Sequence, residues 1–372
     1  MMRTRPPPAT AWAVIILATL LACGAGFISL GEGGLIAWRN AVLLLTGQAA
    51  GSLIVLAAGH LLANDWVEAV RDELEPAAWT IVPLAVLALP LTRLAVPEAP
   101  AIIPADLMTD ARQSWFHDDA IFVRTCILFG GLAGLSIWVS KAGERRFVSA
   151  IALAIAAIFF AIGSADWLLL SRPFWWSTLI PFALLVNQMS AALALGFISN
   201  LVQREKGDEH AFRSLASGLL ALALLSLWVW FSVYLIAWFG NQPDEAGWFL
   251  HRMRGTGTLL LGIWLSGNLL GVAILMFSRR RRWSMTAASA GMLAGYIAGM
   301  LWLLYPAGLR PLALSDLIPI GVLAGLWLVW LALGQRYYDA AHSGSRSASV
   351  IHARSSGSEG GQRSSSPSSE NK

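Results

Sequence analysis

Long apolar segments alternate with short polar ones along almost the whole chain. Each apolar segment is about 20 residues long, and the first reads AWAVIILATLLACGAGFISL. An α-helix of that length rises about 30 Å, the thickness of the hydrocarbon core of a bilayer. The pattern predicts ten membrane-spanning helices, at 12–30, 40–63, 77–95, 120–140, 147–170, 177–200, 213–239, 256–278, 285–305 and 315–335.

The predicted fold class is therefore an all-α, polytopic membrane protein. Two successive groups of four spans, at 40–170 and 177–305, favour two four-helix bundles, with the first and last spans as peripheral helices. The first apolar segment is longer than the core of a cleaved signal peptide, so we expect a retained helix. The membrane domain covers 12–338, after an N-terminal segment at 1–11. The Ser/Gly-rich segment 339–372 predicts a disordered tail.

The composition agrees with a membrane protein. Hydrophobic residues make up 56% of the chain and charged residues 13%, and the mean hydropathy is +0.62. A soluble domain carries about 25% charged residues. Many of the 18 tryptophans stand near predicted span ends, where indole rings prefer the headgroup level. These tryptophans therefore indicate an interfacial belt rather than a ligand site.

Lysine and arginine predict the orientation in the membrane. If both termini are cytoplasmic, 18 of the 26 lysines and arginines lie on the cytoplasmic side and eight outside. The positive-inside rule favours this arrangement. The arginine run at 279–282 then indicates a cytoplasmic anchor and not a nucleic-acid site. The segment WVEAVRDELEP at 66–76 predicts a solvated cytoplasmic elbow, and the longest outer loops are 96–119 and 240–255.

Few polar side chains fall within the predicted spans. Carboxylates at membrane depth often mark ion or proton paths, although a hydrated carboxylate that caps a helix is the alternative. Amides in a span can equally serve hydrogen bonding between helices. The candidates for a proton path are Asp166, Asp316, Asn187, Gln188 and His60.

The sequence predicts no haem and no iron–sulfur cluster in this chain. A haem in a helical bundle commonly takes paired histidines, and no histidine stands at mid-span among His60, His117, His210, His251, His342 and His352. An iron–sulfur cluster takes four thiolates, whereas the chain has only Cys23 and Cys126. No residue spacing typical of a metal site, a P-loop or a catalytic triad occurs. We therefore expect no covalently bound cofactor.

Several short blocks resemble the NrfD/PsrC-like membrane subunits of alternative complex III, in particular its quinone-binding subunit 2. Asp166-Trp167 followed by SRPFWWST is similar to the family pattern DW-x-x-SL-x-P-x-W-x-ST. FSVYLIAWFGNQPDE at 231–245 is similar to FSQY-x-x-IW-x-x-N-x-PEE, and Arg252 follows it. Two shorter patterns of the family also match: W-x4-R-x3-E at Trp66, Arg71 and Glu75, and F-x-R at Phe122 and Arg124. The sequence departs from the family patterns at four positions: Phe174, Leu179, Val233 and Asp244.

This resemblance, over about residues 40–305, implies an integral subunit of a bacterial inner-membrane complex. Such a complex oxidises quinol and reduces an acceptor such as cytochrome c, and this chain would be a subunit without redox centres. The implied partners are a multihaem cytochrome, an iron–sulfur subunit and a second NrfD-like subunit. Quinone is the candidate ligand and proton translocation a candidate role. The implied periplasmic polar cluster joins Asp166 to His117, Asp244, Glu245, His251 and Arg252.

Two alternatives remain at this point. The chain could anchor a molybdopterin/iron–sulfur oxidoreductase, or it could be a solute transporter. Transporters tend to have helices broken by Gly or Pro at matching midplane positions. Here most prolines stand at span ends, and Pro83 and Pro90 fall within a single span. This pattern disfavours transport.

Overall fold

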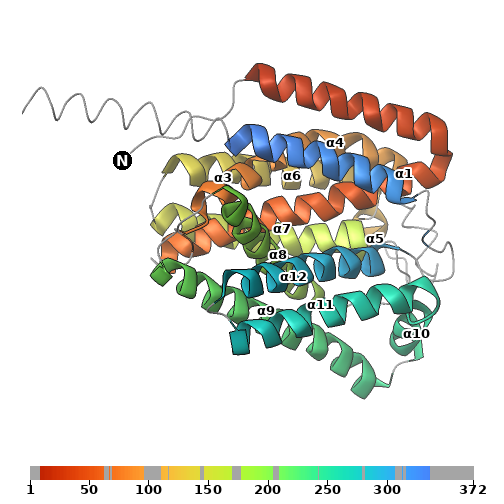
Figure 1. Cartoon of the computed structure of the whole chain (residues 1–372). Helices are drawn as coiled ribbons and strands as arrows, with labels where there is room; N and C mark the ends of the chain where they lie inside the picture. The colour runs from red at the N-terminus through yellow and green to blue at the C-terminus, as the bar shows by residue number, and fades with distance from the viewer. Residues whose placement is uncertain are drawn as a thin grey trace, which may run out of the picture.

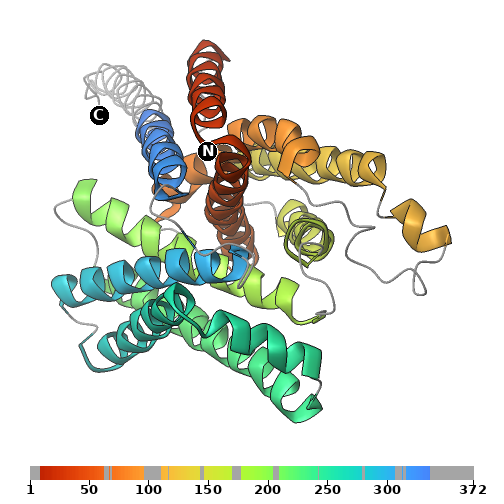
Figure 2. The ribbon, with the colours of Figure 1, turned by 90° about the vertical axis from the view of Figure 1, so that its right-hand side faces the viewer.

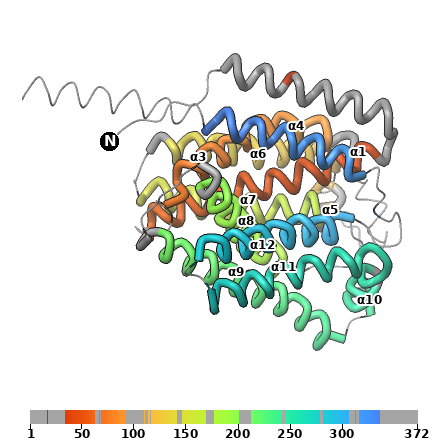
Figure 3. The backbone as a smooth tube through the Cα atoms, in the orientation of Figure 1, coloured from red at the N-terminus to blue at the C-terminus, as the bar shows by residue number. Residues whose placement is uncertain are grey.

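A computed structural model describes the backbone of residues 9–62, 67, 69–95, 110–115, 117–142, 146–169, 177–203, 209–241, 243–278, 281–305, 312 and 316–335. Before Gly34, only the side chain of Leu17 is described. All regular secondary structure in these ranges is helical, and Figure 3 traces the path of the chain through it. The predicted tail at 339–372 and residues 1–8 lie outside these ranges.

Nine helices in the described ranges are long and apolar enough to cross a bilayer. Their bounds are Gly34–Leu62, Arg71–Leu91, Asp118–Ser140, Arg146–Leu168, Ile180–Asn200, Phe212–Gly240, Thr256–Ser278, Arg282–Leu304 and Leu317–Gln335. The chain is therefore a multi-pass, all-α membrane protein, as the hydropathy pattern predicts. The predicted span 12–30 is helical as well and is part of α1 (Ala9–Leu62). Apart from Leu17, the side chains of this span are not among the described residues.

The predicted polar connection between the first two spans is wrong, because α1 stays helical through 31–39. This segment contains no proline, and its charged residues are only Glu32 and Arg39. Arg39 is not in an aqueous loop: it is 5% exposed, and its guanidinium lies 3.3 Å from the amide oxygen of Asn40. A short glycine-rich segment without proline can therefore continue a helix despite its local polarity.

The long helices extend across the view of Figure 1, and the view turned by 90° in Figure 2 shows several of them inclined to one another. The first group contains α1, α3 (Arg71–Trp79), α4 (Ile81–Ala95), α6 (Asp118–Ala142) and α7 (Arg146–Ser164). In this group α1 contacts α4, α4 contacts α6, α6 contacts α7, and α7 contacts α1. A single π-helical turn, η3 (Ala165–Leu169), follows α7 directly.

The second group contains α8 (Ile180–Gln203), α9 (Glu209–Gly240), α11 (Thr256–Ser278) and α12 (Arg282–Leu304). Here α8 contacts α9, α9 contacts α11, α11 contacts α12, and α12 contacts α8. The short helices α5 (Asp110–Trp115) and α10 (Pro243–Arg252) lie in the two long loops. Figure 1 shows α10 at the opposite end of the long helices from α3, and Figure 2 gives the view turned by 90°.

Close approach of backbones joins the two groups. A Cβ atom on Gly51 of α1 would collide with the backbone carbonyl of Gln188 on α8. Gly47, one helical turn earlier, lies against the Gln188 side chain. Two glycines four residues apart let helices pack closely in lipid. In this way α1 and α8 cross at Gln188, and this crossing fixes the position of the site described next.

Candidate intramembrane ligand site

A pocket with about 560 Å³ of empty space, counted to its open mouth, lies between α1, α6, α7 and α8. Its walls are mostly apolar, and four aromatic side chains contribute to them: Phe129, Phe159, Phe160 and Trp167. The second group contributes Leu184 and Gln188 of α8 and Met300 of α12. The apolar, aromatic-rich lining with a few polar groups is typical of a site for a small organic molecule.

Polar side chains in this pocket are few and come from different helices. They are Thr46 of α1, Ser164 of α7 and Gln188 of α8. The Ser164 hydroxyl donates to the Ala161 carbonyl at 3.0 Å, within its own helix. By contrast, Thr46 Oγ1 and Gln188 Oε1 are buried and have no hydrogen-bond partner among the described residues. A buried polar atom without a partner is unfavourable, and both of these atoms belong to residues that line the pocket.

The wall formed by Trp167 is fixed by two contacts to α6. The indole nitrogen donates to Thr125 Oγ1 at 3.2 Å, and the ring packs edge-on against Phe129 with 5.8 Å between ring centroids. Trp167 belongs to η3, and single π-helical turns often occur at functional sites. The tryptophan of the DW pair in the family-like block is thus part of the pocket wall.

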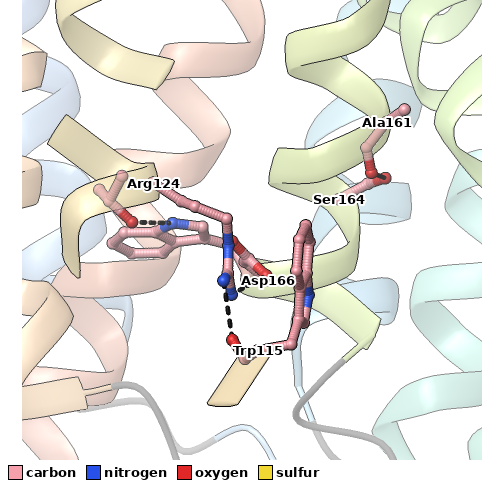
Figure 4. A network of polar contacts seen from close by, with 7 residues as sticks. Trp115, Arg124, Ala161, Ser164 and Asp166 are labelled. Atoms are coloured by element: carbon pink, nitrogen blue, oxygen red, sulfur yellow. Dashed lines mark hydrogen bonds and ion pairs between the residues drawn. The ribbon is translucent and has the colours of Figure 1, made fainter. Parts of the chain in front are cut away.

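Asp166, the residue before Trp167, is paired with Arg124 of α6. The carboxylate is 3% exposed and accepts two hydrogen bonds, from Arg124 Nε at 2.8 Å and from Nη2 at 2.9 Å. The third donor, Nη1, reaches the backbone carbonyl of Trp115 at 2.7 Å, and the guanidinium lies 4.3 Å from the Trp115 ring centre. Figure 4 shows Arg124 between Asp166 and Trp115. This network ties α5, α6 and η3 together beside the pocket.

The adjacent residues Asn187 and Gln188 reach two different cavities. Gln188 lines the pocket described above, whereas Asn187 lines a smaller cavity with about 250 Å³ of empty space, formed with Trp230, Trp264 and Trp302. Asn187 Oδ1 accepts a hydrogen bond from Ser226 at 3.3 Å. Met300 lines both cavities. Of the two amides, only Gln188 belongs to the main pocket.

Two further proton-path candidates lie elsewhere. His60, near the C-terminal end of α1, is buried, and its Nδ1 lies 3.0 Å from the Ser149 hydroxyl of α7. Asp316 is buried at the start of the last described helix. Neither residue lines one of the two cavities.

The described residues of the implied periplasmic cluster contact different partners rather than one another. His117 is exposed, with its Nδ1 3.7 Å from the Asp119 carboxylate. Arg252 is buried under the Trp248 ring at 3.8 Å, and its carbonyl accepts a hydrogen bond from Trp302. The cation paired with Asp166 is Arg124 rather than Arg252. Glu245 lies on α10 and is half-buried, and the side chains of Asp244 and His251 are outside the described set.

Sequence reasoning missed a buried polar cluster at α3. Glu73 and Glu75 are each 2% exposed, so the prediction of a solvated elbow at 66–76 is wrong for them. Glu75 Oε1 accepts from Arg71 at 3.1 Å, and Glu73 Oε1 accepts from the Asn200 amide of α8 at 3.0 Å. The i, i+4 spacing of Arg71 and Glu75 was a signal that could have shown this pairing.

Comparison with known proteins assigns no family. No protein-family model matches the chain. No curated protein matches it either. Among the described residues, no group of three or more His, Cys, Asp or Glu side chains could hold a metal ion.

Proposed function

We propose that this chain is an integral membrane subunit of a quinol-oxidising respiratory complex, and that the pocket between α1, α6, α7 and α8 receives the quinol ring. The observation that carries the proposal is the pocket itself. Four aromatic side chains contribute to its walls, and two of its lining residues, Thr46 and Gln188, each have a buried oxygen without a partner among the described residues. A quinol headgroup matches this combination because it is a flat aromatic ring with polar oxygens at its edges.

The family-like blocks support the same proposal from the sequence. Trp167 of the DW block lines the pocket, and Asp166 of that block pairs with Arg124 of the F-x-R block. The contacts among α1, α4, α6 and α7, and those among α8, α9, α11 and α12, are what two four-helix bundles would make. We infer the alternative complex III type of subunit from this agreement, with the bacterial inner membrane as its location and both termini cytoplasmic.

Oxidation of a quinol releases two electrons and two protons. In the proposed complex the electrons pass to haems and iron–sulfur clusters of partner subunits, and this chain binds the ring and accepts protons. Asp166 is the nearest carboxylate to the pocket along the chain, two residues from Ser164 and next to Trp167. It is therefore our candidate for the first proton acceptor, with Arg124 holding it in place.

Purification of the native assembly tests this function. The chromosomal copy would be tagged at its C-terminus, and the purified material would be analysed for subunits and for electron transfer from a reduced quinol to cytochrome c. We expect a multihaem cytochrome, an iron–sulfur subunit and a second membrane subunit to co-purify, with quinol-dependent reduction. Co-purification with a molybdopterin protein would favour the anchor function, and a protein that purifies without redox subunits would contradict the proposal.

A further inference from the structure

Four consecutive arginines, at 279–282, connect α11 to α12. Because α11 ends at Ser278 and α12 begins at Arg282, the turn between the two helices contains only 279–281. No aspartate or glutamate occurs in the sequence between Glu245 and Asp316, so neither of these helices carries an acidic residue. The positive charge of the turn is therefore not balanced within its own helical hairpin.

The described arginines of this turn lie at the surface of the chain. Arg281 and Arg282 are both exposed. The first turn of α12 has no acidic residue, and the Arg281 side chain at its N-cap makes no capping hydrogen bond. The partial positive charge of a helix N-terminus therefore adds to that of the two cations. Together they attract an anion, and guanidinium groups suit phosphate because they donate to two of its oxygens at once.

Contacts with neighbouring helices hold the turn and direct Arg282. The hydroxyl oxygens of Ser278 and Ser284 lie 2.9 Å apart across the turn. The Arg282 guanidinium lies over the Phe212 ring of α9, 5.6 Å from its centre. That ring in turn packs against Phe197 of α8, with 5.1 Å between ring centroids. Arg282 is thus held against the side of the helical bundle rather than extended away from it.

Two large apolar side chains flank the arginines. Phe277, in the last turn of α11, is 86% exposed, and Trp283, in the first turn of α12, is 65% exposed. Both stand at the ends of membrane spans, where an exposed ring contacts lipid and an indole prefers the headgroup level. The short turn keeps the arginines close to the same level. Cations beside lipid-facing rings match a phospholipid, whereas a soluble phosphate compound would use only the cations.

We propose that the turn between α11 and α12 binds an anionic phospholipid, with Arg281 and Arg282 at the headgroup phosphate and Phe277 and Trp283 against the acyl chains. Basic sites beside membrane helices recognise anionic headgroups in this way. A zwitterionic lipid carries the same phosphate, but its own ammonium group competes with the arginines for it. The inference does not depend on the proposed function, because it uses only the membrane helices and this turn.

Native mass spectrometry of the purified full chain in detergent tests the proposal. Phosphatidylglycerol and phosphatidylcholine with identical acyl chains would be titrated separately, and the dissociation constant of the first bound lipid would be determined for each. We expect the wild-type chain to bind phosphatidylglycerol at least about tenfold more tightly, since two basic residues near an anionic headgroup supply an effect of this size.

Paired variants assign the effect to this turn. Arg281→Gln combined with Arg282→Gln should remove most of the preference, whereas lysine at both positions should keep most of it because the charge remains. The matched control is Arg146→Gln combined with Arg254→Gln, which removes two exposed arginines elsewhere and changes the net charge equally. This control should keep the wild-type ratio. Trp283→Gln should weaken both lipids and leave their ratio unchanged.

The contrary outcomes are distinct from one another. Equal affinity of the wild-type chain for the two lipids, or a preference that survives in the double glutamine variant, would overturn the proposal. Competition by glycerol phosphate at the concentrations at which phosphatidylglycerol binds would show a site for a soluble anion instead. A native assembly that holds no anionic lipid and cross-links this turn to another protein would overturn the proposal in favour of a protein contact. The wild-type ratio remains informative even where a variant does not fold.

Discussion

Arg124 and Asp166, 42 positions apart, form a two-point ion pair next to the ligand pocket, with N–O distances of 2.8 and 2.9 Å. Asp166 is 3% exposed at its side chain and Arg124 14%. The carboxylate is thus the more buried partner, while the guanidinium remains nearer to the surface and rests on the Trp115 ring. This asymmetry predicts that the two residues differ in their tolerance to substitution.

Arg124→Gln should destabilise the protein strongly. It leaves the Asp166 carboxylate buried without its cation, and removal of one partner of a buried pair costs about 3–5 kcal/mol. Adding Asp166→Asn to this variant should recover much of the loss, because no buried charge remains. Thermal unfolding of the purified single and double variants, followed by circular dichroism, measures this. A double variant no more stable than Arg124→Gln would show that the ion pair is not the cause.

Asp166→Asn alone should lower the stability of the fold less than Arg124→Gln does, but it should lower the activity of the complex more. The long Arg124 side chain can move its charge toward water, so the protein should assemble. As a proton acceptor, however, Asp166 is lost, and we expect quinol turnover or coupled proton movement to fall several-fold. Subunit stoichiometry and quinol-to-cytochrome c turnover would be measured in the same membranes. Full assembly with wild-type turnover and proton movement would remove Asp166 from the mechanism.

Gly47→Ala should damage both the fold and the pocket. Its Cβ atom would collide with the Tyr296 hydroxyl and press on the Gln188 amide, and such overpacking costs about 1–3 kcal/mol. The matched control is Gly134→Ala, since a Cβ atom there meets nothing within 4 Å. The control should be neutral or slightly stabilising. Equal melting temperatures and equal ligand affinities of the two variants would contradict the described crossing of α1 and α8.

The orientation in the membrane can be tested with single cysteines, in a protein whose Cys23 and Cys126 are replaced by serine. Asp119 and Arg254 are exposed on the predicted outer side, and Phe147 and Arg281 are exposed on the predicted cytoplasmic side. Cysteines at the first two positions should react with an impermeant maleimide in intact cells whose inner membrane is sealed. Those at the other two should react only after permeabilisation. The reverse pattern would place both termini outside.

Hydropathy alone predicted the membrane spans well because burial in lipid requires a continuous apolar helix. It failed where a polar residue is buried by tertiary partners. Arg39 was assigned to a loop, and Glu73 and Glu75 to a solvated elbow, because a hydropathy window registers their charge and not the neighbouring helices that cover them. Polar residues at helix ends therefore need contact information before their exposure can be assigned.

In the candidate site, the sequence likewise did not show which residues from different helices contact one another. The sequence marked Gln188 as deep in its span and Asp166 as a candidate for a proton path, whereas it indicated neither the partner of Asp166 nor the pocket. Arg124 pairs with Asp166 because α6 packs beside α7, which continues directly into η3. The pocket requires residues from five α-helices and from η3. Such arrangements depend on which helix faces neighbour one another, which the periodicity of one chain does not specify.

Photoaffinity labelling of the native assembly tests the central claim most directly. An azido-substituted quinol analogue would be illuminated in the purified complex, and the labelled peptides identified by mass spectrometry, with and without excess unmodified quinol. We predict label on the pocket-lining segments of α1, α6, α7–η3 and α8 that excess quinol suppresses, and loss of that label in Gln188→Met. Label confined to another subunit, or label on these segments that excess quinol does not suppress, would contradict a quinol site in this chain.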